Sequence, residues 1–183
     1  MAGNNERGFS PLETVVAVAI TSLLMLALGS LFIMVMRADA RARALERESA
    51  VARQIMDRII FELRAGSLSY AGFPGGVVPA TPSTLLPIQS SDGSIVTYTT
   101  GGAGECDTGA APCILRTDST GSVRLTPSGM SVENFVFYIE PPGTSTAPLV
   151  TIVIEMNDVT VPRAAPFHLQ TSVTTRLPYA PYR

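Results

Sequence analysis

The side chains that could perform redox or metal chemistry are few in this chain: Cys106, Cys113 and a single histidine, His168. The cysteines lie seven positions apart, and the residues between them include Asp, Gly and Pro, which favour a turn. In an oxidising compartment such a pair predicts a disulfide. The alternatives are two free thiols or half of a metal site, and no further Cys or His lies nearby in sequence to support them.

A membrane-anchored hydrolase is the enzyme class to weigh, and the sequence lacks its motifs. It contains no Gly-x-Ser-x-Gly sequence, no phosphate-binding loop and no cluster of metal ligands. His168 falls in an alternating segment, which predicts a solvent-facing or core position in a strand. Asp92, Asp107 and Asp118 fall in predicted turns, where aspartate bonds its own backbone. We therefore expect no enzyme, no cofactor and no bound metal.

An uncharged apolar run over residues 15–36 dominates the N-terminal part of the sequence. As a helix it would extend about 33 Å, enough to cross the hydrocarbon core of a bilayer. A helix in the core of a soluble protein would carry a polar face, and this run has none. We expect a membrane-spanning helix with Glu13 at its edge. An ionisable group at that place is costly and usually has a partner.

Three interpretations fit such a segment. A secretory signal peptide is suggested by the small residues Ala38-Asp39-Ala40, although the run is long for a signal and Arg37 lies just before that site. A simple signal anchor is the second interpretation. The third is a prepilin leader, and the residues before the run favour it. A short polar segment, residues 1–7, is followed by Gly8-Phe9-Ser10-Pro11-Leu12-Glu13.

This hexapeptide resembles the type IV prepilin signature, in which a glycine precedes an aromatic residue and a glutamate follows five positions after the glycine. The resemblance implies that a membrane-embedded prepilin peptidase cuts between Gly8 and Phe9 and methylates the new amino group of Phe9. In a polymer the partner of Glu13 can be the Phe9 ammonium of a neighbouring subunit, since attraction in a low-dielectric bundle is stronger than in water. The alternative is that Glu13 lies in the headgroup zone as part of the first turn of the helix. Pro11 stands where family members often carry an aliphatic residue, and proline is tolerated at a helix start.

The positive-inside rule leaves the orientation open, because Arg7 is offset by Glu6 while Arg37, Arg41 and Arg43 follow the span. The prepilin resemblance and the expected disulfide both place the N-terminus in the cytoplasm and the remainder of the chain outside. The expected location is therefore a single-pass inner or cytoplasmic membrane protein. Assembly would then carry it into an extracellular pilus or a periplasmic pseudopilus.

After the apolar run the pattern becomes that of an amphipathic helix, with apolar residues at every fourth position: Val51, Ile55, Ile59 and Leu63. Together the two patterns predict one helix from about Pro11 to Ala65, about 80 Å long, with Gly66 as its stop. Oppositely charged residues four apart predict the ion pairs Arg53–Asp57 and Arg58–Glu62. We expect the stripe to pack within the chain and not in a coiled coil, because a β-rich sequence follows at once.

Residues 66–92 are rich in Gly, Pro and Ser and predict a loop region with at most a short strand near residues 84–89. Beyond them, strands are predicted at residues 94–99, 113–117, 122–125, 132–140, 149–157 and 167–176. The predicted fold is α+β and pilin-like, with the long N-terminal helix packed on an antiparallel β-sheet. The expected segments are a leader (1–8), a transmembrane and polymerisation segment (9–36), the amphipathic half of the same helix (37–65) and a β-rich head (66–183).

Residues 44–73 and 167–176 also resemble the stalk and last strand of the J-type minor pseudopilins of type II secretion and of the W-type minor pilins. The implied function is a minor pilin or pseudopilin subunit. Its partners would be other pilin or pseudopilin subunits, prepilin peptidase, the inner-membrane assembly platform and membrane lipid. A major pilin is the alternative within the family, and a membrane-anchored adhesive or binding head is the alternative outside it. The net charge of −2 and the scattered arginines beyond Ala65 offer no basic patch for nucleic acid.

Overall fold

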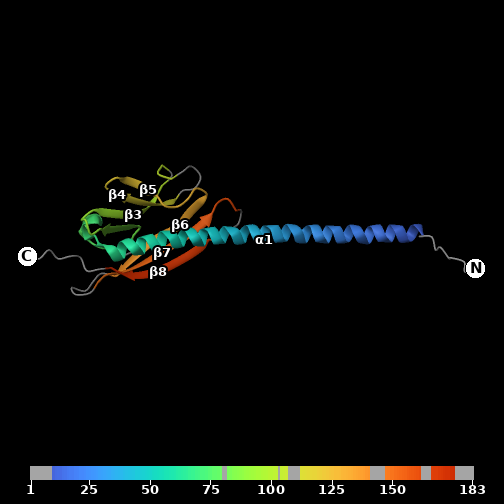
Figure 1. The fold of residues 1–183 in the computed structure, drawn as a ribbon, viewed down its shortest axis with the longest axis horizontal. Coiled ribbons are helices and arrows are strands. Elements are labelled where there is room, and N and C mark those ends of the chain that lie inside the picture. The colour runs from blue at the N-terminus through green and yellow to red at the C-terminus, as the bar shows by residue number, and fades with distance from the viewer. Residues whose placement is uncertain are drawn as a thin grey trace, which may run out of the picture. The chain divides into compact units, whose positions relative to one another are not determined.

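The structure, a computed structural model, describes residues 10–79, 82–102, 104–106, 112–140, 147–161 and 166–175. One long helix, α1 (Pro11–Ala65), precedes a series of strands and short 3-10 helices (Figure 1). The chain divides into two compact units, Met1–Ala42 and Arg43–Arg183. α1 continues from the first unit into the second.

α1 begins and ends where the sequence predicts. Pro11 is its first residue, and proline fits there because the N–H groups of a first turn have no partner within the helix. Thr14 N–H donates to the carbonyl of Ser10 at 3.2 Å, which closes this first turn. The helix then continues for 55 residues to Ala65, so the single helix predicted from the two apolar patterns is confirmed.

The second unit contains two antiparallel sheets. The five-stranded sheet has the order β1-β2-β3-β4-β5, with strands at Ser67–Leu68, Leu85–Gln89, Ile95–Gly101, Cys113–Asp118 and Gly121–Arg124. The three-stranded sheet has the order β6-β7-β8, with strands at Met130–Glu140, Leu149–Asp158 and Phe167–Thr174. The 3-10 helices η1 (Tyr70–Gly72) and η2 (Pro74–Gly76) lie between β1 and β2. The α+β class is confirmed, but the one sheet expected from the sequence is two.

The two sheets separate where β5 leads into β6. Gly129, with φ at +87°, lies in the connection and turns the chain away from β5. The first residues of β6 then meet the start of β4, where Val132 N–H donates to Pro112 O at 2.9 Å. Further along β6, Phe137 forms an isolated antiparallel β-bridge with Ser83, with two backbone hydrogen bonds of 2.8 Å between them. Short bridges therefore join β6 to the five-stranded sheet in place of a continuous ladder.

The apolar stripe of α1 packs against these sheets, as the sequence predicts. In the second unit the C-terminal part of α1 lies along β6, β7 and β8 (Figure 1). Its buried apolar side chains are Ala44, Ala52, Ile55, Met56, Ile59 and Leu63. All but Ala44 form one core with side chains of both sheets. Val51, which the sequence placed in the stripe, is only half-buried, so the buried face is centred slightly differently from the prediction.

The alternation of inward and outward side chains along β6 is interrupted once. Its register against β7 shifts between Val132 and Asn134, which is a β-bulge. Val132 and Phe135, three positions apart, consequently both point into the core. Phe135 and Phe137 then contact each other edge to face, with ring centroids 4.6 Å apart. The bulge explains why the apolar residues of this strand do not follow one strict alternation.

Shortening a buried side chain in the apolar stripe of α1 should lower the free energy of unfolding of the second unit. Ile59 is completely buried, so Ile59→Ala is expected to lower the free energy of unfolding by about 2–5 kcal/mol. Phe61 lies on the opposite side of α1 and is 71% exposed. Phe61→Ala is the matched control and should change that free energy by less than about 0.5 kcal/mol. Denaturant titration followed by circular dichroism measures both, and equal losses would contradict the packing.

The predicted disulfide is present: Cys106 and Cys113 are bonded, with Cα atoms 5.9 Å apart. Cys113 is the first residue of β4, and Cys106 lies in a turn after β3 in which its N–H donates to Gly102 O at 3.0 Å. Both cysteines are buried in a small cluster with Leu115. The loop residues 107–111 between them lie outside the described residues.

Removing this disulfide should cost stability. Replacing Cys106 and Cys113 together by serine is expected to lower the free energy of unfolding by about 2–3 kcal/mol, because the loop they close is short. Urea titration of the double variant and of the wild type, each with and without reductant, measures the loss. The reduced wild type should unfold like the double variant. A double variant as stable as the oxidised wild type would contradict the expected contribution.

Candidate functional site

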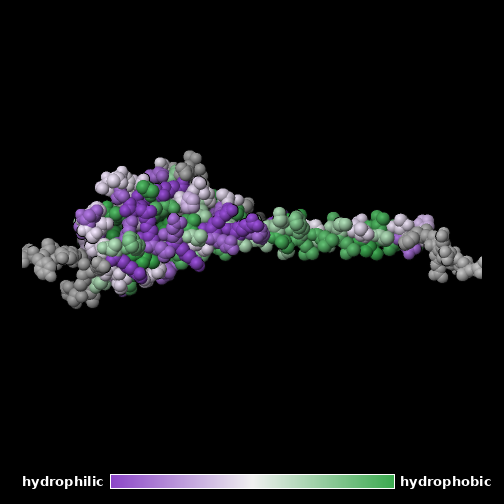
Figure 2. All heavy atoms as spheres, in the orientation of Figure 1, coloured by the Kyte–Doolittle hydropathy of each residue, from purple (hydrophilic) through white to green (hydrophobic). Residues whose placement is uncertain are grey.

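The N-terminal half of α1 presents an apolar surface on all sides. The large apolar side chains of residues 12–36 are 49–75% exposed, and Figure 2 shows this part of the helix covered by apolar atoms. Such a continuous apolar surface is unfavourable in water. Among the described residues, α1 is the one helix long and apolar enough to cross a membrane, and it lies near the N-terminus. Lipid or other apolar helices around α1 would remove this surface from water.

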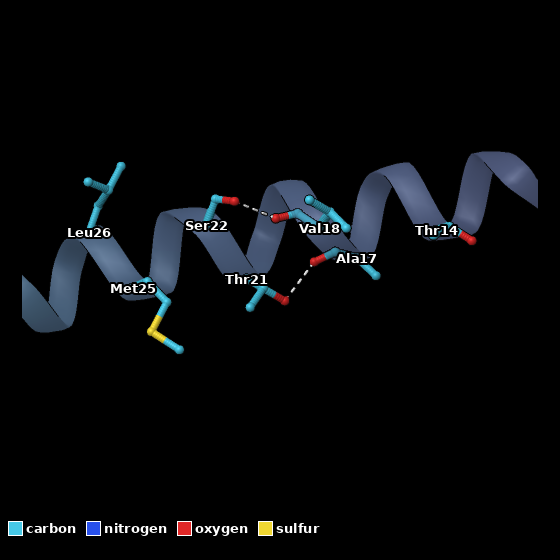
Figure 3. Close-up of a pocket in the computed structure, with 7 residues that line it drawn as sticks. All are labelled: Thr14, Ala17, Val18, Thr21, Ser22, Met25 and Leu26. Carbon is cyan, nitrogen blue, oxygen red and sulfur yellow. Dashed lines mark hydrogen bonds between the residues drawn. The ribbon is translucent and has the colours of Figure 1, made fainter.

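The hydroxyl groups within this surface are satisfied by the helix itself. Thr21 Oγ1 donates to Ala17 O at 2.7 Å, and Ser22 Oγ donates to Val18 O at 2.8 Å (Figure 3). Each hydroxyl thus bonds the carbonyl one turn earlier and needs no water. In a bilayer core, where unsatisfied polar groups are costly, these side chains are therefore tolerated.

A shallow depression follows the same part of α1. It is lined by Thr14, Ala17, Val18, Thr21, Ser22, Met25 and Leu26 (Figure 3). One helix alone forms it and it is open along its length, so it is not an enclosed ligand cavity. Ala17 and Thr21 lie one turn apart in this depression, and their small side chains would let a neighbouring helix approach closely, as small residues do between membrane helices.

Glu13 is the one charged residue within this apolar part of α1. It lies in the first turn and is exposed, and it forms no ion pair within the described part of the chain. An acidic residue in a first turn interacts favourably with the partial positive charge of the helix N-terminus. Gly8 and Phe9, the predicted processing residues, lie outside the described residues. Glu13 thus lies at the start of the apolar surface, while Phe9, its predicted partner in a neighbouring subunit, is not among the described residues.

Comparisons with known proteins leave the family open. No family model, no curated protein and no solved structure matches the chain. The long apolar N-terminal helix and the antiparallel strands that follow it are compatible with a pilin-like architecture.

One of the two ion pairs predicted along α1 forms. Arg58 Nε lies 3.6 Å from Glu62 Oε1, whereas no ion pair joins Arg53 and Asp57 in the structure as described. Glu62 is only 16% exposed and is also bound by Arg116 of β4 at 3.0 Å, which holds its carboxylate in place. Arg53 and Asp57 are both exposed, and an exposed pair gains little from association.

Arg116 joins α1 to β4 and to the turn after it. Its Nη1 donates to Asp118 Oδ2 at 2.5 Å, while Asp118 Oδ1 accepts from the N–H and hydroxyl of Thr120. The hydrogen bonds from Thr120 and then that from Arg116 hold the pKa of Asp118 far below its usual range. Tyr98 is fully buried beside this group, and burial, then the negative charge of Glu62, raises the pKa of its hydroxyl. These contacts fasten the helix to the sheet.

The other polar residues singled out in the sequence have structural positions. His168 lies on the exposed face of β8, with Nε2 3.3 Å from Glu155 Oε1. Asp92 accepts hydrogen bonds from the N–H and the hydroxyl of Ser94 at 2.9 and 2.7 Å, as an aspartate in a turn does. The turn position of Asp92 is confirmed, whereas Asp118 is the last residue of β4 and bonds Thr120 in the turn that follows. Asp107 lies outside the described residues.

Sequence reasoning missed Glu48. It lies on the buried face of α1 one turn before Ala52, and it is 0% exposed. Its Oε1 accepts a hydrogen bond of 2.6 Å from the backbone N–H of Asp158, the last residue of β7. Burial raises the pKa of Glu48, the hydrogen bond from Asp158 lowers it, and the negative charge of Asp158 raises it further, for a net increase. The sequence feature that could have revealed it is a glutamate at a position where the apolar stripe of the helix predicts a buried residue.

Proposed function

We propose that this chain is a minor pilin or pseudopilin subunit of a type IV pilus or a type II secretion filament. It is cut after Gly8 by prepilin peptidase, which methylates Phe9. It is then held in the membrane by α1 and assembled through that helix. The observation that carries the proposal is the apolar surface of α1 over residues 12–36, exposed on all sides and beginning at Glu13.

Assembly exchanges the lipid around α1 for the corresponding helices of neighbouring subunits. Lipid tails are as apolar as leucine, so the exchange gains little from the hydrophobic effect and depends on close packing and on polar contacts. Ala17 and Thr21, one turn apart in the depression, provide a place for close packing. Glu13 provides the polar contact, because its attraction to the Phe9 ammonium of a neighbour is far stronger among apolar helices than in water.

The second unit is the head that the membrane helix carries. Its disulfide suits an oxidising compartment, which supports a head outside the cytoplasm. Its partners are other pilin or pseudopilin subunits, and before assembly the peptidase, the membrane lipid and the assembly platform. This arrangement requires a single pass through the inner or cytoplasmic membrane with the N-terminus inside.

Sheared filaments test this function. The tagged chain is produced in its own host, filaments are sheared from the cells or overproduced as pseudopili, and the subunits are quantified by mass spectrometry. We expect the chain in the filament fraction at a small fraction of the main subunit, and its loss when the peptidase is inactive. A chain that forms the bulk of the filament would be a major pilin. A chain displayed on cells and absent from filaments would be an anchored binding head, and the proposal would fail.

A further inference from the structure

Two buried acidic residues, Glu48 and Asp158, lie where α1 packs against the end of β7. Glu48 is 0% exposed and Asp158 is 3% exposed. Glu48 Oε1 accepts the 2.6 Å hydrogen bond from Asp158 N–H, whereas Glu48 Oε2 is buried with no hydrogen-bond partner in the described residues. Asp158 Oδ1 is occupied by the N–H and the hydroxyl of Thr160 at 2.8 and 2.5 Å. A glutamate fully removed from water thus keeps one oxygen without a donor.

The charged groups next to Glu48 and Asp158 in the described part of the chain come from β7, α1 and β6. From β7 the ionisable group facing Glu48 is Asp158, which has the same sign. On α1 the adjacent cation is Arg47, which lines a cavity of about 350 Å³ together with Asp158 and Thr160. Arg47 forms no ion pair with either carboxylate in the described part of the chain. The nearest acid on β6, Glu133, is exposed and accepts a hydrogen bond from Asn157.

We propose that Glu48 holds a proton on Oε2 in the folded second unit, so that the contact between α1 and the end of β7 is closed by protonation and loosened when the proton leaves. With Oε2 protonated, the fully buried side chain is neutral, while Oε1 still accepts the hydrogen bond from Asp158 N–H. Two carboxylates in a shared site cannot both ionise without cost, and the cost is greatest away from water.

The cavity beside Asp158 gives the proton a route. Asp158 lines this cavity and Glu48 does not, so exchange with solvent passes through the Asp158 side of the pair. No redox partner is involved, since the proton arrives from water on acidification and returns to it when the pH rises. Protonation of Glu48 therefore depends on the pH of the compartment around the second unit. It affects the packing of the first helical turns of α1 within that unit.

The sign of the pH dependence follows from the direction of the shift. The pKa of Glu48 is raised in the folded state above its ordinary value of 4.5, so the folded state holds its proton more tightly than the unfolded chain. The contribution to stability is complete below that ordinary value. It is lost as the pH rises from there through the folded-state pKa. The second unit should therefore be more stable in mild acid than in neutral solution.

Glu48→Gln tests the proposal in the full chain held in detergent micelles. Glutamine keeps the oxygen that accepts from Asp158 N–H, adds an N–H donor in place of the proton, and does not titrate. We expect its melting temperature to equal that of the wild type near pH 4.5 and to exceed it at pH 8 by at least about 2 °C. Glu46→Gln, an exposed neighbour on the same helix, is the control and should leave the wild-type pH dependence unchanged.

Carbon NMR of the side-chain carboxyl groups gives a second readout, in which the titration of Glu48 is followed in the wild type itself. The wild type should show one glutamate resonance, missing in Glu48→Gln, that titrates above the ordinary glutamate range. Asp158→Asn removes the neighbouring charge and should shift that titration to lower pH. A Glu48 resonance that titrates in the ordinary range, or a Glu48→Gln variant destabilised equally at both pH values, would overturn the proposal.

Discussion

Glu13→Ala is expected to remove the chain from filaments while leaving its insertion in the membrane intact. In our account the apolar surface that lies in lipid begins next to Glu13 and does not include its side chain, so membrane extraction should not change. Assembly depends, in our account, on the attraction between Glu13 and the Phe9 ammonium of a neighbour. Losing about 1.4 kcal/mol of such attraction per subunit lowers incorporation about tenfold, and the loss among apolar helices is larger.

The comparison needs variants that separate charge from shape. Glu13→Gln keeps the size of the side chain and removes its charge, so it should be lost from filaments like Glu13→Ala. Glu13→Asp keeps the charge on a shorter side chain and should recover part of the incorporation. Quantitative immunoblotting of membranes and sheared filaments measures both quantities. Incorporation of Glu13→Ala at the wild-type level would contradict a role for this carboxylate in assembly.

Gly8→Leu is expected to block maturation almost completely, so that the precursor accumulates in the membrane. A protease must bring its catalytic groups close to the backbone at the scissile bond, and glycine allows a closer approach than any other residue. The proposed cut between Gly8 and Phe9 also creates the amino group that Glu13 needs. Uncleaved subunits should therefore be absent from filaments as well.

The same substitution elsewhere in the leader controls for its apolar character. Gly3→Leu introduces an identical side chain five positions before Gly8. It should be processed like the wild type, as judged by the mass of the membrane form. Normal cleavage of Gly8→Leu would show that the bond after Gly8 is not the processing site. Equal blockage of both variants would show that the leader as a whole, and not Gly8, determines cleavage.

Local patterns allowed much of the fold to be predicted from the sequence. The bounds of α1 follow from an uncharged run, a four-residue repeat and Gly66, whose position leaves no room for a side chain because an added Cβ would lie 2.3 Å from Gln89 O. The strands from β3 to β8 lie within a few residues of the predicted segments, and in β7 the side chains alternate in burial as the sequence pattern indicates. β1 was missed because two residues in a Gly- and Ser-rich segment show no alternation.

Long-range contacts could not be predicted in this way. The hydrogen bond from Asp158 to Glu48 joins residues 110 positions apart, and that between Arg116 and Glu62 joins residues 54 apart. Periodicity predicts on which side of its own helix or strand each of these residues lies. It does not predict which residue of another element contacts it across the core. The division into two sheets likewise depends on the turn at Gly129. The processing residues Gly8 and Phe9 lie outside the described residues, and the assembly role of Glu13 stays a prediction.

Intact mass and N-terminal sequencing of the protein from its native membrane test the central claim most directly. The account predicts a chain that begins at Phe9 and carries a methyl group on its amino nitrogen, with the disulfide intact. Such a chain would have passed through the prepilin pathway, and the type of filament would be the next question. A chain that begins near Asp39 or Ala40 would have lost the apolar helix to signal peptidase. It would be a secreted β-rich domain, and the assembly role of Glu13 would be wrong.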